Sequence, residues 1–114
     1  MKNAEPPLFT KMYDITRWLL ERVEGFPRVH RVTIGQRVSE CALIILEDLT
    51  RAQFRKKKRE LLMGCNERLD TLRVLLRLAV DTKALSFRQY EFITGELQEA
   101  GRMLGGWIAH QRQA

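Results

Sequence analysis

The stretch LRVLLRLAVDTKALSFRQ, residues 72–89, predicts two helices joined by a short turn. Apolar residues before the turn alternate at spacings of three and four, a seven-residue repeat that suits near-parallel helix packing. The repeat comprises Leu62, Cys65, Leu69, Leu72, Leu76 and Ala79. After the turn, SFRQ at 86–89 matches the capping box, in which Ser86 and Gln89 each satisfy a backbone amide at a helix N-terminus. Because the break DTKALS is short, the two helices should be antiparallel neighbours.

Two further helices are expected upstream. Apolar residues recur at helical spacing from Leu8 to Val23, and the sequence GFP at 25–27 ends that pattern. TIGQ, residues 33–36, matches a second capping box, which predicts that the next helix begins near Thr33. Its expected buried face is Ile34, Val38, Cys41, Ile45, Leu49 and Ala52. The last helix would bury Phe87, Tyr90, Ile93, Leu97, Ala100, Leu104 and either Trp107 or Ile108.

These patterns predict an all-α protein, an up-and-down antiparallel four-helix bundle. With 114 residues, of which 45% are hydrophobic, the chain is expected to form one domain over 1–114, with short flexible ends at about 1–7 and 110–114. The two middle helices are apolar over wider arcs than a bundle core needs, which predicts a partner surface, and a second copy of the chain is the simplest supplier. No apolar run is long enough to span a membrane and no signal peptide is evident, so a cytoplasmic protein without a membrane partner is expected.

The positive charge is concentrated in one run, RAQFRKKKR at 51–59. The chain has 20 basic and 14 acidic residues, a net charge of +6, and this run holds six of the basic residues and no acidic one. The candidates for a nucleic-acid site within it are Arg55, Lys56, Lys57, Lys58 and Arg59. Such a local field attracts polyanions, of which nucleic acid is the commonest in a cytosol. A solvated turn that keeps the protein soluble is the competing interpretation, and the run alone does not decide between them.

No enzyme signature is present. His30 and His110 have no carboxylate or cysteine at a metal-ligand spacing, and no nucleophile is paired with a base. Cys41 and Cys65 lie within apolar helical patterns without a C-x-x-C motif, which favours buried free thiols over a disulfide or a metal site. A non-enzymatic protein with no metal or cofactor is therefore expected.

Three glycines stand in GRMLGGW, residues 101–107, within the last helix. Glycine inside a helix costs about 1 kcal/mol relative to alanine, so a compensating role is expected. Gly101 and Gly105 are four residues apart and share a helix face, where a second backbone or a bulky side chain could approach closely. With Trp107, they are candidates for helix packing or for contact between copies.

Arg73 and Arg77 lie one helical turn apart in an otherwise apolar segment. Guanidinium groups on such a rigid frame suit bidentate contacts with phosphate or carboxylate. Asp70 precedes Arg73 by three residues and Asp81 follows Arg77 by four, so spacing alone favours an internal ladder of ion pairs. Two further arginines, Arg68 and Arg88, would extend a basic surface.

Three stretches give the chain a family resemblance: FPRVHRVTIGQRV at 26–38, LDTLRVLLRLAVDTKALSFRQYEF at 69–92 and AGRMLGGWIAH at 100–110. In them the chain resembles the accessory variability determinant (Avd) proteins of diversity-generating retroelements, within a wider group of four-helix proteins that includes those encoded by ribosomal-RNA intervening sequences. The resemblance covers residues from about 8 to 110, and GRMLGGW is its most specific part.

The resemblance implies a homopentameric barrel of four-helix bundles that binds RNA and DNA and associates with the retroelement's reverse transcriptase. Such a protein is a non-enzymatic accessory while the polymerase copies a template-repeat RNA into mutated cDNA, which then replaces a variable repeat in a target gene. The arginines of the family pattern L-R-x-x-L-R match Arg73 and Arg77, which moves the interpretation from an internal ladder towards a partner-binding surface. The run from Arg55 to Arg59 lies in a connection that varies in such proteins, so its assignment depends on composition alone.

Two alternatives to a retroelement accessory remain at this level. One is an RNA-associated four-helix protein related to the intervening-sequence proteins, and the other is a purely structural oligomeric bundle whose basic turn only maintains solubility. A neighbouring reverse-transcriptase gene would separate the first alternative from the accessory protein. Nucleic-acid binding that persists near physiological salt would exclude the second.

Overall fold

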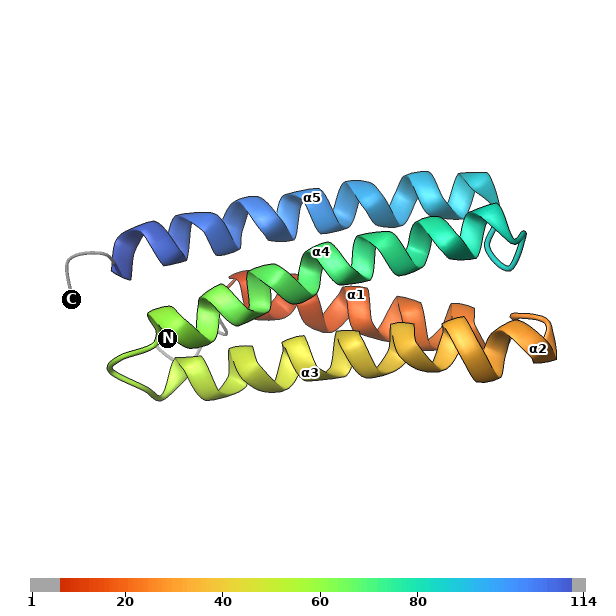
Figure 1. Cartoon of the computed structure of the whole chain (residues 1–114). Coiled ribbons are helices and arrows are strands. Elements are labelled where there is room, and N and C mark those ends of the chain that lie inside the picture. The colour runs from red at the N-terminus through yellow and green to blue at the C-terminus, as the bar shows by residue number, and fades with distance from the viewer. Residues whose placement is uncertain (1–6, 112–114) are drawn as a thin grey trace.

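The computed structural model describes residues 7–111, which form four long helices and a short helical lead-in to the second of them (Figure 1). The elements are α1 (Pro7–Glu24), α2 (Arg28–His30), the π-helical turn η1 (Arg31–Gly35), α3 (Gln36–Gln53), α4 (Arg59–Asp81) and α5 (Phe87–His110). No strand occurs among these residues. Because α2, η1 and α3 follow one another without a break, they act as one long helix.

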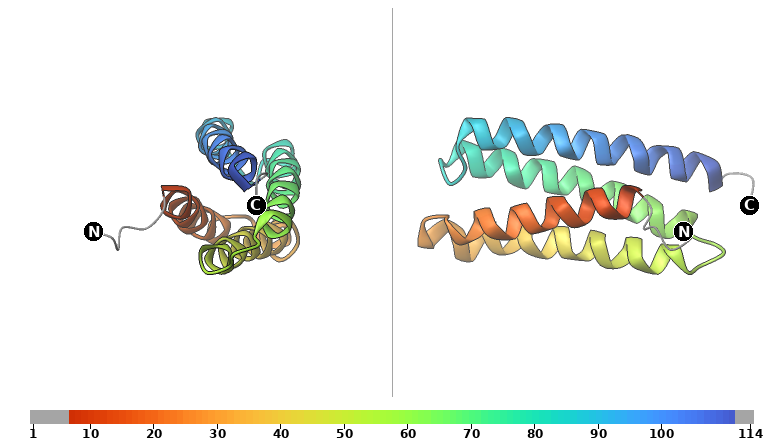
Figure 2. Two further views of the ribbon diagram at one scale, coloured as in Figure 1. Left: turned by 90° about the vertical axis from the view of Figure 1, so that its left-hand side faces the viewer. Right: turned by 180° about the vertical axis from the view of Figure 1, so that it is seen from behind.

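The long helices run up and down and enclose one core. α1 packs against α3 and α5, and α4 packs against the same two helices (Figure 2). The α3–α4 connection and the end of α5 lie at one end of the bundle, whereas the α1–α2 and α4–α5 turns lie at the other (Figure 1). The predicted four-helix bundle is thus confirmed for the single chain, and its assembly into a pentamer stays a prediction.

The core follows the predicted repeat. All six repeat residues of α4 are at most 1% exposed: Leu62, Cys65, Leu69, Leu72, Leu76 and Ala79. In α3 the predicted face is buried from Val38 to Ala52, while Ile34, which lies in η1, is only half-buried. Two exposed apolar side chains of α4, Val74 and Leu78, lie on the surplus arc that the sequence indicated.

The turn between α4 and α5 ends in the predicted capping box. The Gln89 backbone amide donates to Ser86 Oγ over 3.1 Å, and the Ser86 amide donates to Gln89 Oε1 over 3.0 Å. The burial predicted for Phe87 was wrong, since this side chain is 66% exposed. Phe87 is the first residue of α5 and lies beyond the end of the core, where Leu85 from the turn is buried instead.

The helix start predicted at Thr33 was wrong. The helix begins at Arg28, directly after Pro27, so that His30 is also helical. Thr33 Oγ1 donates to the Val29 carbonyl over 2.7 Å, a bond within the helix, and caps nothing. The glycine of TIGQ, Gly35, is buried, and a Cβ there would lie 2.8 Å from the Val23 side chain. It therefore serves close packing of the helix on α1.

The ends of the chain differ slightly from the prediction. Pro7 is already part of α1 and His110 is still part of α5, so these two positions are helical. Gln111 is described as the C-cap residue of α5. The rest of the expected flexible ends, at 1–6 and 112–114, lies outside the described residues. No described helix combines the length and the hydropathy that crossing a bilayer requires.

Candidate nucleic-acid interface

The basic run forms the connection between α3 and α4. Its first arginine, Arg51, is still within α3 and is paired with Asp48 over 2.7 Å. Arg55, Lys56 and Lys57 are exposed, and none of them has an ion-pair partner within residues 7–111. Three cations are therefore free to meet a polyanion at this end of the bundle.

The last two cations of the run are held against α5. The Lys58 ammonium lies over the Trp107 ring, 5.3 Å from its centroid, a distance typical of a cation–π contact. Arg59 donates to the Ile108 carbonyl over 3.1 Å. These contacts attach the connection to the end of α5, where Trp107 is partly buried.

Arg73 lies in the seam between α4 and α5. One guanidinium nitrogen bonds Asp70 over 2.6 Å, and the other is 3.4 Å from the Leu97 carbonyl on α5. The guanidinium approaches α5 where the helix has a glycine, because a Cβ on Gly101 would lie 2.7 Å from it. Half of the expected ladder is therefore present, and Arg73 is largely engaged within the bundle.

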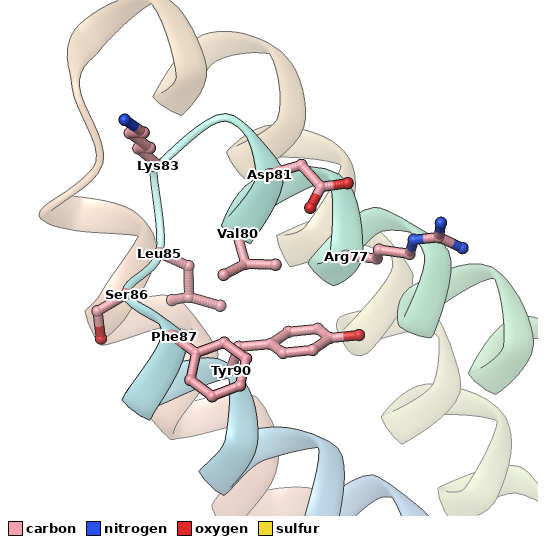
Figure 3. Close-up of a pocket in the computed structure, with 8 residues that line it drawn as sticks. All are labelled: Arg77, Val80, Asp81, Lys83, Leu85, Ser86, Phe87 and Tyr90. Carbon is pink, nitrogen blue, oxygen red and sulfur yellow. The ribbon is translucent and has the colours of Figure 1, made fainter.

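Arg77 differs, although it lies only one turn further along α4. It is exposed and forms no ion pair with Asp81. It lines a groove of about 660 Å³ between α4, the turn and α5. Figure 3 shows the Tyr90 ring lying across this groove, with its hydroxyl on the side of Arg77, and the Phe87 ring beside it. The groove thus places the unpaired Arg77 beside two aromatic rings.

The remaining predicted arginines belong neither to the α3–α4 connection nor to the lining of the Arg77 groove. Arg68 and Arg88 are exposed, on the middle of α4 and the first turn of α5. At a rise of 1.5 Å per residue, Arg59 and Arg77 are separated by about 27 Å along α4. The α3–α4 connection and the Arg77 groove are therefore two separate regions of one chain.

The two paired glycines of α5 have different surroundings. The Arg73 guanidinium occupies the space where a side chain at Gly101 would begin, whereas no atom lies within 4 Å of a Cβ placed on Gly105. Gly105 is exposed, so nothing within the described chain requires a glycine there. Its predicted role in contact between copies stays a prediction.

Replacing Gly101 by alanine should test the Arg73 contact. Gly95 is open and exposed on the same helix, so Gly95→Ala is expected to raise the free energy of unfolding by about 1 kcal/mol through helix propensity alone. Gly101→Ala should fall short of this gain by about 1 kcal/mol, because its Cβ displaces the guanidinium from the Leu97 carbonyl. Urea unfolding measures both.

A double variant separates the causes. If the shortfall comes from Arg73, Gly101→Ala should give the full gain in an Arg73→Ala background. Equal gains at Gly95 and Gly101 in the wild-type background would contradict the contact.

The two cysteines offer no reactive thiol. Both are free and buried, as predicted. Burial raises the pKa of the Cys65 thiol to about 12, an effect that the Asp48 carboxylate increases and Arg68 opposes. Burial also raises the pKa of Cys41. Both thiols therefore stay protonated at neutral pH, and residues 7–111 contain no group of three or more His, Cys, Asp or Glu side chains placed to hold a metal ion.

Phe54, an exposed residue of the α3–α4 connection, was not identified as a candidate from the sequence. Phe54 stands between Gln53 and Arg55 in the basic run, and its side chain is 82% exposed. An aromatic residue among cations is itself a signal for nucleic-acid contact. The sequence contained this signal, but only the structure shows that the ring is outside the core.

Fold and site together define a class, the basic four-helix-bundle proteins that present unpaired cations at their ends. Within this class, the model of the bAvd-like family matches residues 8–111. The chain belongs to that family and is an Avd-type protein. The search of curated proteins found no match.

Proposed function

We propose that this protein is the non-enzymatic accessory factor of a diversity-generating retroelement, which binds the element's RNA and cDNA and its reverse transcriptase during mutagenic cDNA synthesis. The observation that carries the proposal is the family match, which spans 8–111 and so includes every described basic residue discussed above. The unpaired cations at both ends of the bundle support it, because polyanion binding needs charge that is not already neutralised.

Assembly would strengthen the weak contacts of a single chain. If five copies form the ring that the family resemblance implies, their formal charge amounts to about +30 from +6 each. A template RNA could then touch several subunits at once, and multivalency would raise the overall affinity without any new contact. Since phosphate contacts carry little sequence information, RNA shape or the polymerase would supply specificity.

Arg77 is the residue at which to test this function. Arg77→Ala should leave the bundle folded, since the side chain is exposed and unpaired, and should lower cDNA yield several-fold in a reaction reconstituted from the protein, the reverse transcriptase and template RNA. Arg17→Ala is the matched control, because it removes one exposed arginine from α1.

The outcomes separate the functions. Unchanged cDNA yield with Arg77→Ala, at unchanged helical content, would remove the Arg77 groove from the site. A wild-type protein that binds RNA but never alters polymerase activity would instead indicate an RNA-associated bundle unconnected to a retroelement. Equal losses with Arg77→Ala and Arg17→Ala would indicate that only net charge matters.

A further inference from the structure

Phe54 is the most exposed large apolar side chain among residues 7–111. Its side chain is 82% exposed, against 66% for Val74 and Phe87. A phenylalanine that leaves so much ring in water gains little from folding. Its presence in the chain therefore calls for a role outside the core.

The backbone that carries the Phe54 ring is held in a defined position. Phe54 caps α3, where its backbone amide donates to the Arg51 carbonyl over 3.1 Å, and the next amide, of Arg55, donates to Ala52 over 3.4 Å. On the far side of the connection, Lys58 lies over Trp107 and Arg59 bonds the end of α5. The connection is thus attached at both ends, so that the ring and the cations between these anchors project from a short segment.

The residues around Phe54 supply the second half of a recognition surface. Arg55, Lys56 and Lys57 follow it directly and are exposed without ion-pair partners in the described chain. Double-stranded nucleic acid presents phosphates to such cations but keeps its bases stacked inside. Single strands present both phosphates and free base faces, and proteins bind them with cations beside aromatic platforms.

We propose that Phe54 and the three cations that follow it form a site for single-stranded nucleic acid, in which one base stacks on the Phe54 ring and the neighbouring phosphates contact Arg55, Lys56 and Lys57. The proposal rests on the proposed function, which requires nucleic-acid binding, and adds where and how the strand is held. It gives the protein a preference for unpaired template or cDNA over a duplex.

The other exposed aromatic of this kind is a weaker candidate. Phe87 lies in the groove of Figure 3, whose lining includes the carboxylate of Asp81 together with Arg77 and Lys83. Figure 3 shows the Lys83 side chain directed away from the groove. The run that contains Phe54, residues 51–59, has no acidic residue and therefore suits a polyanion better, so Phe87 serves as the matched control.

The experiment measures the affinity of the full chain for a labelled oligouridine and for an RNA duplex of equal length, by fluorescence anisotropy over a range of salt concentrations. Phe54→Leu should weaken binding of the single strand about 5-fold to 100-fold, the range expected for the loss of one stacked base. Binding of the duplex should stay within about 2-fold, because no charge is lost. Phe54→Trp should keep or raise the affinity for the single strand, and Phe87→Leu should leave it unchanged.

The salt dependence identifies the contribution of the ring. Phe54→Leu should leave the slope of log affinity against log salt unchanged, whereas Lys56→Gln should reduce it by about 0.7. If the wild type binds and Phe54→Leu binds equally well, the stacking proposal is overturned while the proposed function stands. If the wild type binds neither RNA, the proposed function fails.

A bilayer is the other partner that an aromatic residue among cations could meet. Vesicles of phosphatidylserine and phosphatidylcholine test it in the same assay format. Binding of the wild type to these vesicles that Phe54→Leu abolishes, with no effect of this change on oligouridine, would overturn the proposal in favour of a membrane contact. No binding to the vesicles, together with the single-strand loss, would support it.

Discussion

Replacing Arg55, Lys56 and Lys57 together by glutamine is expected to weaken binding of single-stranded RNA about 50-fold at about 0.15 M salt, because each lost phosphate contact removes about 0.7 from the salt slope. All three side chains are exposed and unpaired among the described residues, so the substitutions should not disturb the fold. Anisotropy titrations at several salt concentrations give both the affinity and the slope. The slope should fall by about 2.

A control with the same net charge shows whether position matters. Replacing Arg17, Arg28 and Arg37 by glutamine also lowers the formal charge of +6 by three, but these exposed arginines lie outside the α3–α4 connection. We expect this variant to retain most of the affinity. Equal weakening by the two triple variants would show that the overall charge, rather than the α3–α4 connection, determines binding.

Leu72→Ala is expected to lower the free energy of unfolding by about 3 kcal/mol, through lost burial and the cavity left behind. Leu72 is fully buried near the middle of α4, whose repeat forms one wall of the core. Urea unfolding followed by circular dichroism checks the change, at one fixed protein concentration because assembly would add to the apparent stability.

Val74→Ala provides the comparison, since Val74 lies two residues further along α4 and is 66% exposed. Within a single chain, the substitution should change stability by less than about 0.5 kcal/mol. A larger effect that grows with protein concentration would place Val74 in a contact between copies. An effect of Leu72→Ala as small as that of Val74→Ala would contradict the packing of α4.

The two arginines of the L-R-x-x-L-R pattern, Arg73 and Arg77, differ in what they contact. Arg73 bonds Asp70 and reaches the Leu97 carbonyl, so it aligns α4 with α5, while Arg77 is available to a partner. The two arginines that the resemblance assigned to one surface thus have different surroundings in this chain. Variants of Arg73 should therefore be assessed for stability before any loss of binding is attributed to the site.

The sequence by itself determined the bundle. Apolar spacing of three and four residues is a local property of the chain, and it identified every buried residue of the α4 repeat because a helix presents the same face wherever it packs. The Ser86 capping box could be predicted for the same reason, since its bonds join residues three apart. The position of the excess positive charge, in residues 51–59, also follows from the sequence alone.

Only the tertiary structure decided which of these local signals took effect. TIGQ matches a capping box as well as SFRQ does, yet the helix that contains TIGQ already begins after Pro27. The Val23 side chain of α1 occupies the space where a Cβ at Gly35 would lie. Arg73 and Arg77 each have an aspartate at a suitable spacing, but Arg73, unlike Arg77, lies opposite a glycine of α5 and reaches the Leu97 carbonyl. These outcomes depend on atoms distant in sequence, which spacing along a single helix does not specify. The exposure of the Phe54 ring also depends on the tertiary structure. Packing between the helices decides where the core ends, and an apolar side chain beyond that end stays in water.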